Sequence, residues 1–132
     1  LLIADPTLVG ALRIDVNSTD VGYVDSIVDT FYNDVPVEKF KVFQASLHPD
    51  EPAQVFGVPS NPTPQKYGTV PRYFVTCTQD NAIPYPAQLE MIRLMDESIG
   101  GSTKVFTLDT SHSPFLSSPD ELAMIVVDIA TN

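Results

Sequence analysis

Residues 72–78, with the sequence RYFVTCT, decide the fold class of this chain. The segment is almost continuously apolar and rich in β-branched and aromatic residues, which is typical of a strand covered on both faces in a parallel sheet. A helix is predicted from about Pro86, with apolar residues at 89, 92, 95 and 99 on one face, ending at the glycine pair 100–101. A second strand is predicted at Lys104–Leu108, and the capping box SPDE at 118–121 opens a final helix. The order strand, helix, strand, helix predicts half of a doubly wound α/β sheet.

The first half of the chain has a different pattern and ends in a proline-rich connection. Six of the twelve prolines lie between Pro49 and Pro71, so this stretch is predicted to be extended, without a long helix or an inner strand. Before it, the spacing of apolar residues predicts a helix over 21–31 and another that begins at Pro36 and stops before residue 48. The apolar segment 8–14 is either a strand or a helix turn. The chain is therefore expected to have two parts, residues 1–66 and residues 67–132.

Net charge argues against two classes of partner. The 132 residues include seventeen acidic and seven basic side chains, which give a formal charge of −10, and the basic residues form no stripe. A surface of this sign repels nucleic-acid phosphates and anionic membranes, and no apolar run approaches the roughly 20 residues that span a bilayer. The chain starts without Met or a basic leader, so no secretion signal is visible and a cytoplasmic location is expected. Because it opens within an apolar stretch, we expect a chain that has been cut.

Two polar loops carry the residues that could do chemistry. Open α/β sheets bind ligands at the carboxyl ends of their strands, where the first predicted strand is followed by Asp80 and the second by His112. A carboxylate beside an imidazole supplies two members of a nucleophile–base–acid triad, and the order acid then histidine is that of α/β-hydrolases. Asp80 alone is often only a turn or helix-cap residue. Asp109 is the rival carboxylate, although its place on the histidine loop favours a role in shaping that turn.

Other chemistries find no support in the sequence. His48 and His112 are 64 positions apart (112 minus 48), and with the single cysteine, Cys77, they give no metal-ligand spacing. Neither G-x-G-x-x-G nor G-x-x-x-x-G-K is present, so no metal or nucleotide cofactor is expected. Cys77 cannot form an internal disulfide and is interpreted as a small buried hydrophobic residue. The chain also lacks G-x-S-x-G, the elbow that holds a nucleophilic serine.

Both loops and their flanks resemble a known family. Residues 67–84, YGTVPRYFVTCTQDNAIP, are similar to the strand and acid loop of the α/β-hydrolase branch that includes plant methylesterases, hydroxynitrile lyases and related bacterial and fungal esterases. Residues 108–116, LDTSHSPFL, followed by 118–122, resemble the histidine loop and last helix of that branch. Residues 8–47 are similar to its helical cap. The resemblance implies the C-terminal half of an α/β-hydrolase: cap and connection in residues 1–66, and the C-terminal part of the core in residues 67–132.

The resemblance also implies a reaction and a site. It implies hydrolysis of a carboxylic ester or lactone of a small, largely apolar molecule, with His112 as general base and Asp80 as its orienting acid. Five apolar residues are expected to line the substrate pocket, and each is alternatively a plain core residue. They are Phe31, Phe40 and Phe43 from the cap, and Ile83 and Phe115 beside the two loops.

The nucleophile is expected on another polypeptide. The family carries its serine and oxyanion hole in the first half, so a second chain with the N-terminal half of the same hydrolase is the expected partner, and a homodimer is left open. Lyase or decarboxylase chemistry on the same scaffold, or non-catalytic binding of a small ligand, are the alternatives. Hydroxynitrile lyases of this branch place a lysine after the histidine and a tryptophan in the cap. Here Ser113 follows His112 and no tryptophan is present, which argues against cyanohydrin cleavage.

Overall fold

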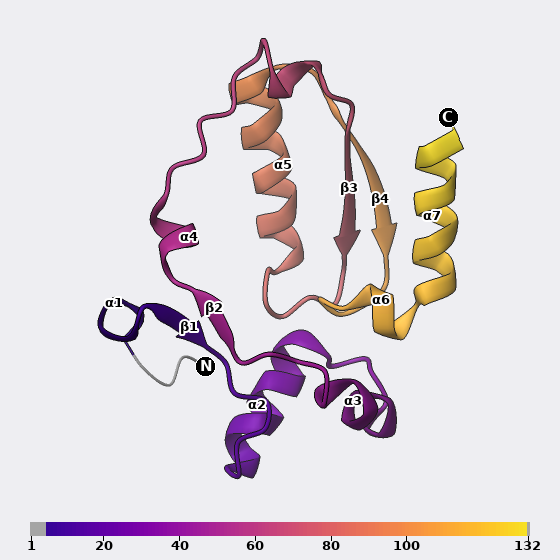
Figure 1. Ribbon diagram of the computed structural model, residues 1–132. Helices are drawn as coiled ribbons and strands as arrows, with labels where there is room; N and C mark the ends of the chain where they lie inside the picture. The colour runs from indigo at the N-terminus through magenta and orange to yellow at the C-terminus, as the bar shows by residue number, and fades with distance from the viewer. Residues whose placement is uncertain (1–4, 132) are drawn as a thin grey trace. The chain divides into compact units, whose positions relative to one another are not determined.

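The computed structural model describes residues 5–131 of the chain (Figure 1). They divide into two compact units, with the boundary between Ser60 and Asn61 in the proline-rich connection. None of the helices in the described part of the chain has both the length and the apolar character needed to cross a bilayer.

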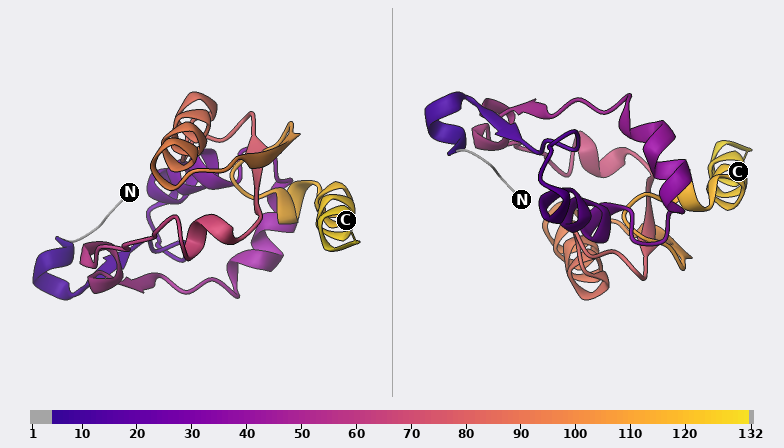
Figure 2. Two further views of the ribbon diagram at one scale, coloured as in Figure 1. Left: turned by 90° about the horizontal axis from the view of Figure 1, so that it is seen from above. Right: turned by 90° about the horizontal axis from the view of Figure 1, so that it is seen from below.

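The second unit is built on two parallel strands. β3 (Arg72–Cys77) and β4 (Thr103–Leu108) pair in a register that runs from Arg72 opposite Thr103 to Cys77 opposite Leu108. The strands lie between α5 (Tyr85–Ile99), which connects them, and α7 (Pro119–Thr131), as both views show (Figures 1 and 2). The predicted order of strand, helix, strand and helix is confirmed, and a further short helix, α6 (Pro114–Ser117), precedes α7.

The residues of the two strands are buried to different extents along the sheet. At the carboxyl end of β3, Thr76 is fully buried and Cys77 is 6% exposed, as expected for a strand covered on both faces. Tyr73 and Val105 are 39% and 42% exposed, so this expectation fails at the start of the sheet. One helix on each side is too narrow to cover both strands along their full length.

A buried arginine fixes the other end of the sheet. The Arg72 guanidinium donates hydrogen bonds to Asp96 Oδ1 at 3.0 Å and to the Gly100 carbonyl at 2.6 Å. Asp96 in turn accepts a hydrogen bond from the Thr103 amide at 3.0 Å. The strand starts are thereby tied to the end of α5. The predicted stop at the glycine pair is confirmed, because Gly100 and Gly101 have φ angles of 81° and 80°, which favour glycine.

The first unit contains four short helices and a small antiparallel sheet. In chain order these elements are α1 (Pro6–Val9), β1 (Ala11–Arg13), α2 (Val21–Phe31), α3 (Val37–Gln44), β2 (Asp50–Pro52) and α4 (Gln54–Gly57). Segment 8–14 thus contains both a helix turn and a strand. In the proline-rich stretch, β2 pairs with β1 in a two-stranded sheet, which suits an edge strand containing proline. The 3-10 turn η1 (Tyr67–Thr69) follows in the second unit.

Helices α2 and α3 form the small core of the first unit. Asp20 caps α2 by accepting a hydrogen bond from the Tyr23 amide at 3.1 Å, and Ile27 is 1% exposed. Phe40 of α3 is 3% exposed, and its ring lies 5.0 Å from the Tyr32 ring. Burial raises the pKa of Tyr32. Helix α3 ends at Gln44, earlier than predicted, because the following residues close as tight turns.

Candidate active site

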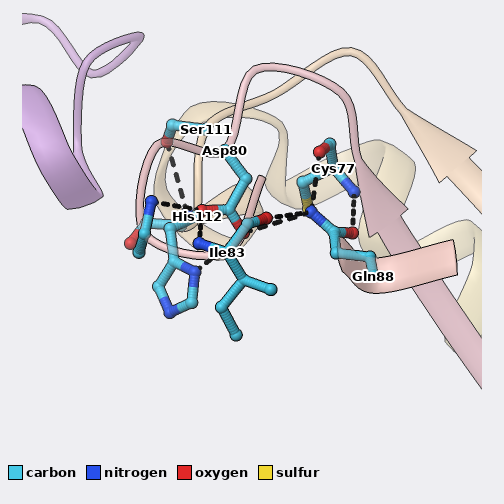
Figure 3. A network of polar contacts seen from close by, with 8 residues as sticks. Cys77, Asp80, Ile83, Gln88, Ser111 and His112 are labelled. Carbon is cyan, nitrogen blue, oxygen red and sulfur yellow. Dashed lines mark hydrogen bonds and ion pairs between the residues drawn. The ribbon is translucent and has the colours of Figure 1, made fainter. Parts of the chain in front are cut away.

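The loops after β3 and β4 start side by side. Pairing continues beyond the strands, because the Thr78 amide donates to the Leu108 carbonyl and the Gln79 amide to the Thr110 carbonyl, each at 3.0 Å. The carboxyl ends of parallel strands lie at one edge of a sheet, so the two loops emerge together. They bring Asp80 Oδ2 to 2.9 Å from His112 Nδ1, as Figure 3 shows.

Asp80 is held by contacts to both of its carboxylate oxygens. The residue is 8% exposed. Its Oδ1 accepts hydrogen bonds from the backbone amides of Ala82 and Ile83, both at 2.8 Å. Its Oδ2 faces His112 and lies 3.3 Å from Nε2 of Gln88. A carboxylate used as an acceptor at both oxygens cannot rotate without breaking hydrogen bonds, so its direction is fixed.

His112 presents one ring nitrogen to Asp80 and the other away from it (Figure 3). Its side chain is 37% exposed. Beside an ionised carboxylate, Nδ1 carries the proton and Nε2 keeps its lone pair, which can take a proton from a nucleophile. The backbone around His112 is stabilised by a hydrogen bond from the Ser113 amide to Oγ of the fully buried Ser111, at 3.2 Å.

Asp109 has a different role from Asp80. Its Oδ1 accepts hydrogen bonds from the Thr78 hydroxyl at 2.5 Å and from the Gln79 side-chain amide at 3.0 Å. The hydrogen bond from Thr78, followed by that from Gln79, holds the pKa of Asp109 below its usual range. Asp109 therefore bridges the two loops and does not bond to His112.

Comparisons with known proteins agree with this architecture. No protein-family model matches the chain. A pyrethroid hydrolase from Sphingobium wenxiniae is 27% identical over 111 residues, which are 84% of this chain and 38% of that protein. A putative chloroplastic methylesterase 11 from Arabidopsis thaliana is 37% identical over 65 residues, 48% of this chain and 15% of the relative. The chain thus spans about two fifths of the pyrethroid hydrolase it matches.

Solved structures give the fold. A crystal structure of polyneuridine aldehyde esterase superposes with a TM-score of 0.62 at 21% identity, over 79% of this chain and 40% of that one. A pyrethroid hydrolase structure, PytH, superposes with the same TM-score at 23% identity, over 91% of this chain and 42% of the other. The described part of the chain therefore has the fold of part of an α/β-hydrolase. The β3–α5–β4–α7 unit corresponds to part of an α/β-hydrolase core, as the sequence predicted.

The apolar residues expected to line a substrate pocket occupy different environments. Ile83 is half-buried beside the Asp80–His112 pair, and the side chain of Phe115, on α6, is 51% exposed. In the first unit, Phe31 and Phe43 are half-buried around the Tyr32 ring, with ring centroids 6.2 Å from it. Phe40 is buried against the same ring, as a core residue would be.

One member of the candidate site was missed by sequence reasoning. Gln88 is 3% exposed although it is polar, and it contacts both Asp80 and the last residue of β3. Leu89, which was predicted to lie on the buried face of α5, is 42% exposed. Gln88 is in helical phase with Ile92 and with Ile99, which is 6% exposed. A polar residue in phase with buried apolar residues is the signal that could have identified it.

Within residues 5–131, no group of three or more His, Cys, Asp or Glu side chains is placed to hold a metal ion. The arrangement at the loops instead provides one oriented base. It can accept a proton at Nε2 of His112 and keep the resulting imidazolium beside a buried carboxylate.

Proposed function

We propose that the complete protein hydrolyses a carboxylic ester or lactone of a small, largely apolar molecule. The observation that carries the proposal is the 2.9 Å contact between Asp80 Oδ2 and His112 Nδ1, with the second ring nitrogen directed away from Asp80. The similar proteins are a pyrethroid hydrolase, a putative methylesterase and polyneuridine aldehyde esterase, and this supports the reaction class. Two apolar side chains support an apolar substrate: Ile83, which lies beside the Asp80–His112 pair, and the half-exposed Phe115, which follows the His112 loop.

The reaction proceeds in two proton-coupled halves. A serine hydroxyl attacks the carbonyl carbon while His112 Nε2 takes its proton, and Asp80 stabilises the imidazolium through Nδ1. The tetrahedral intermediate collapses, and His112 returns the proton to the departing alcohol. Water then attacks the acyl-enzyme with the same base, which releases the carboxylic acid and restores the serine.

The serine belongs, in this proposal, to polypeptide outside the 132 residues. The chain has no G-x-S-x-G. A hollow of about 420 Å³ lies along α5 and β3, lined mainly by apolar and aromatic side chains that include Tyr73, Phe74, Met91 and Ile92. Such a surface needs cover. We propose that the N-terminal half of the same hydrolase, present as a second chain, provides both this cover and the nucleophile.

The β3 edge supports the same arrangement. The amide and carbonyl of Cys77 pair with the Gln88 side chain and not with β4. Because strand backbone groups alternate in direction, those of Val75 and Tyr73 point to the same edge of β3 as those of Cys77. A further strand can therefore pair with β3 along this edge as far as Val75. At Cys77 the Gln88 side chain already occupies the backbone hydrogen-bonding groups.

The test is turnover of p-nitrophenyl butyrate by the complete protein and its His112→Ala variant. Removal of the base should lower kcat by roughly three or more orders of magnitude. Activity of the variant within about tenfold of wild type would overturn the assignment of His112 as base. No turnover by the wild type across a series of aryl and alkyl esters and lactones would overturn the proposed hydrolase function.

A further inference from the structure

We propose that Gln88 is the positioning residue of the Asp80–His112 pair, holding the loop from Cys77 to Ile83 in the shape that keeps Asp80 Oδ2 on His112 Nδ1. The inference rests on the proposed function for its catalytic consequence. Its structural content, the control of Asp80 and His112 by one amide, is testable without a substrate.

A single amide joins both ends of the acid loop. The Cys77 backbone amide donates to Gln88 Oε1 at 2.9 Å, and Gln88 Nε2 donates to the Cys77 carbonyl at 3.0 Å. The same Nε2 donates to the Ile83 carbonyl at 2.7 Å. Cys77 is the last residue of β3, and Ile83 lies two residues before α5 begins. The Gln88 side chain therefore bonds to the Cys77 backbone as a residue of an adjacent strand would, and it closes the loop by also bonding to Ile83 (Figure 3).

Gln88 positions Asp80 mainly through Ile83. An amide nitrogen has two hydrogens, and here it has three acceptors: the carbonyls of Cys77 and Ile83, and Asp80 Oδ2 at 3.3 Å. The two shorter contacts take the hydrogens first, so Gln88 bonds weakly to Asp80 itself. The Ile83 carbonyl is fixed by Gln88, while the Ile83 amide donates to Asp80 Oδ1 at 2.8 Å. A shift of Ile83 would therefore move the carboxylate relative to His112.

Glutamine is suited to this position because it carries a donor and an acceptor on one planar group. Glutamate at 88 would turn a second carboxylate toward two carbonyl oxygens and toward Asp80. Methionine would fill the same space but leave the Cys77 and Ile83 groups without a partner. Gln88 is 3% exposed, so there is little room for water to replace the lost hydrogen bonds.

The first measurement is the tautomer of His112 in the complete protein, read from the ¹⁵N chemical shifts of its ring. In the wild type the neutral ring should carry its proton on Nδ1. In Gln88→Met the loop relaxes, and a substantial population should carry the proton on Nε2, which cannot act as base. For esters turned over by the wild type, kcat should fall about 10- to 100-fold while KM changes by less than about threefold.

Thr103→Val is the matched control. It removes a 2.7 Å hydrogen bond to Asp96 and destabilises the same sheet at the end remote from Asp80. At a temperature where both variants are folded, this control should keep the wild-type tautomer and kcat. A wild-type tautomer in Gln88→Met, or an equal tautomer shift in Thr103→Val, would overturn the inference.

Gln88→Glu keeps the test decisive if the methionine variant does not fold. It retains an acceptor for the Cys77 amide but removes the donor to the Ile83 carbonyl, so the loop should relax and part of the neutral His112 population should carry its proton on Nε2. A wild-type tautomer of His112 in this variant would contradict the inference. If the wild type turns over no ester, the proposed function fails, while the tautomer still decides the role of Gln88.

Discussion

Replacement of Asp80 by asparagine changes one atom and should reverse the polarity of its contact with His112. Oδ1 of the asparagine can keep the hydrogen bonds from Ala82 and Ile83, both at 2.8 Å. Its NH₂ group then replaces Oδ2 and faces His112 Nδ1, 2.9 Å away, as a donor. The imidazole must accept at Nδ1 and carry its proton on Nε2. The base thereby loses the lone pair that it needs.

The expected loss is large in rate and small in stability. The same change in the trypsin triad lowers kcat about 10⁴-fold, an example taken from that enzyme. A similar loss in the complete protein corresponds to about 5 kcal/mol in the activation barrier. The free energy of unfolding should fall by only about 1–3 kcal/mol, because one charged hydrogen-bond acceptor is lost while the two backbone bonds to Asp80 remain. The variant should therefore fold and bind substrate but turn over slowly.

The assay compares kcat of Asp80→Asn and Asp109→Asn on an aryl ester, with circular dichroism to verify folding. Asp109 is exposed and bonds to Thr78 and Gln79, so its replacement should change kcat by no more than about threefold. If Asp80→Asn kept kcat within about tenfold of wild type, the assigned acid would be wrong. A larger loss in Asp109→Asn would identify Asp109 as the acid.

Three further predictions concern the scaffold. Hydrogen bonds from Thr103, and to a smaller extent from Arg72, hold the pKa of Asp96 below its unperturbed value of 3.8. The ionised carboxylate therefore stabilises the fold above pH 3.8, and this stabilisation is lost as the pH falls through the lowered pKa. Urea titrations of the complete protein should show that the wild type has a larger free energy of unfolding than Asp96→Asn at about pH 5. Most of this difference should disappear as the pH falls to about 2, and a pH-independent difference would contradict the prediction. Gly100→Ala and Gly101→Ala should each lower the melting temperature, because φ angles of 81° and 80° are strained for a residue with a side chain; an unchanged melting temperature in both variants would refute this. The 132-residue chain produced alone should bind a hydrophobic dye and lack a cooperative transition, and a cooperatively folding 14.4 kDa monomer would contradict the proposed second chain.

The sequence predicts the second unit well because its signals are local. Segment 72–78 has strand composition, the glycine pair ends α5, and polar loops follow both strands, so the sequence alone predicts that Asp80 and His112 are paired. Their 2.9 Å contact follows from parallel pairing, which brings consecutive strand ends to one edge. Helix α6 has only four residues, too few to show a period.

What the sequence missed depends on side-chain packing. Gln88 has a polar side chain, so a search for apolar periodicity passed over it, and only the fold shows that its amide pairs with Cys77. The environments of Phe40 and Phe115 differ for the same reason. Both are phenylalanines in short helices, yet one is 3% and the other 51% exposed. Propensity and spacing do not encode which neighbours cover a ring.

The central claim is that His112 activates a serine located outside these 132 residues. The most direct measurement is peptide mass analysis of the complete protein after reaction with a fluorophosphonate, which phosphonylates an activated serine and releases fluoride. The account predicts a single adduct on a serine of a G-x-S-x-G peptide that lies outside this chain, absent from the His112→Ala protein. An adduct on a serine within residues 1–132, or equal labelling of the His112→Ala protein, would contradict it.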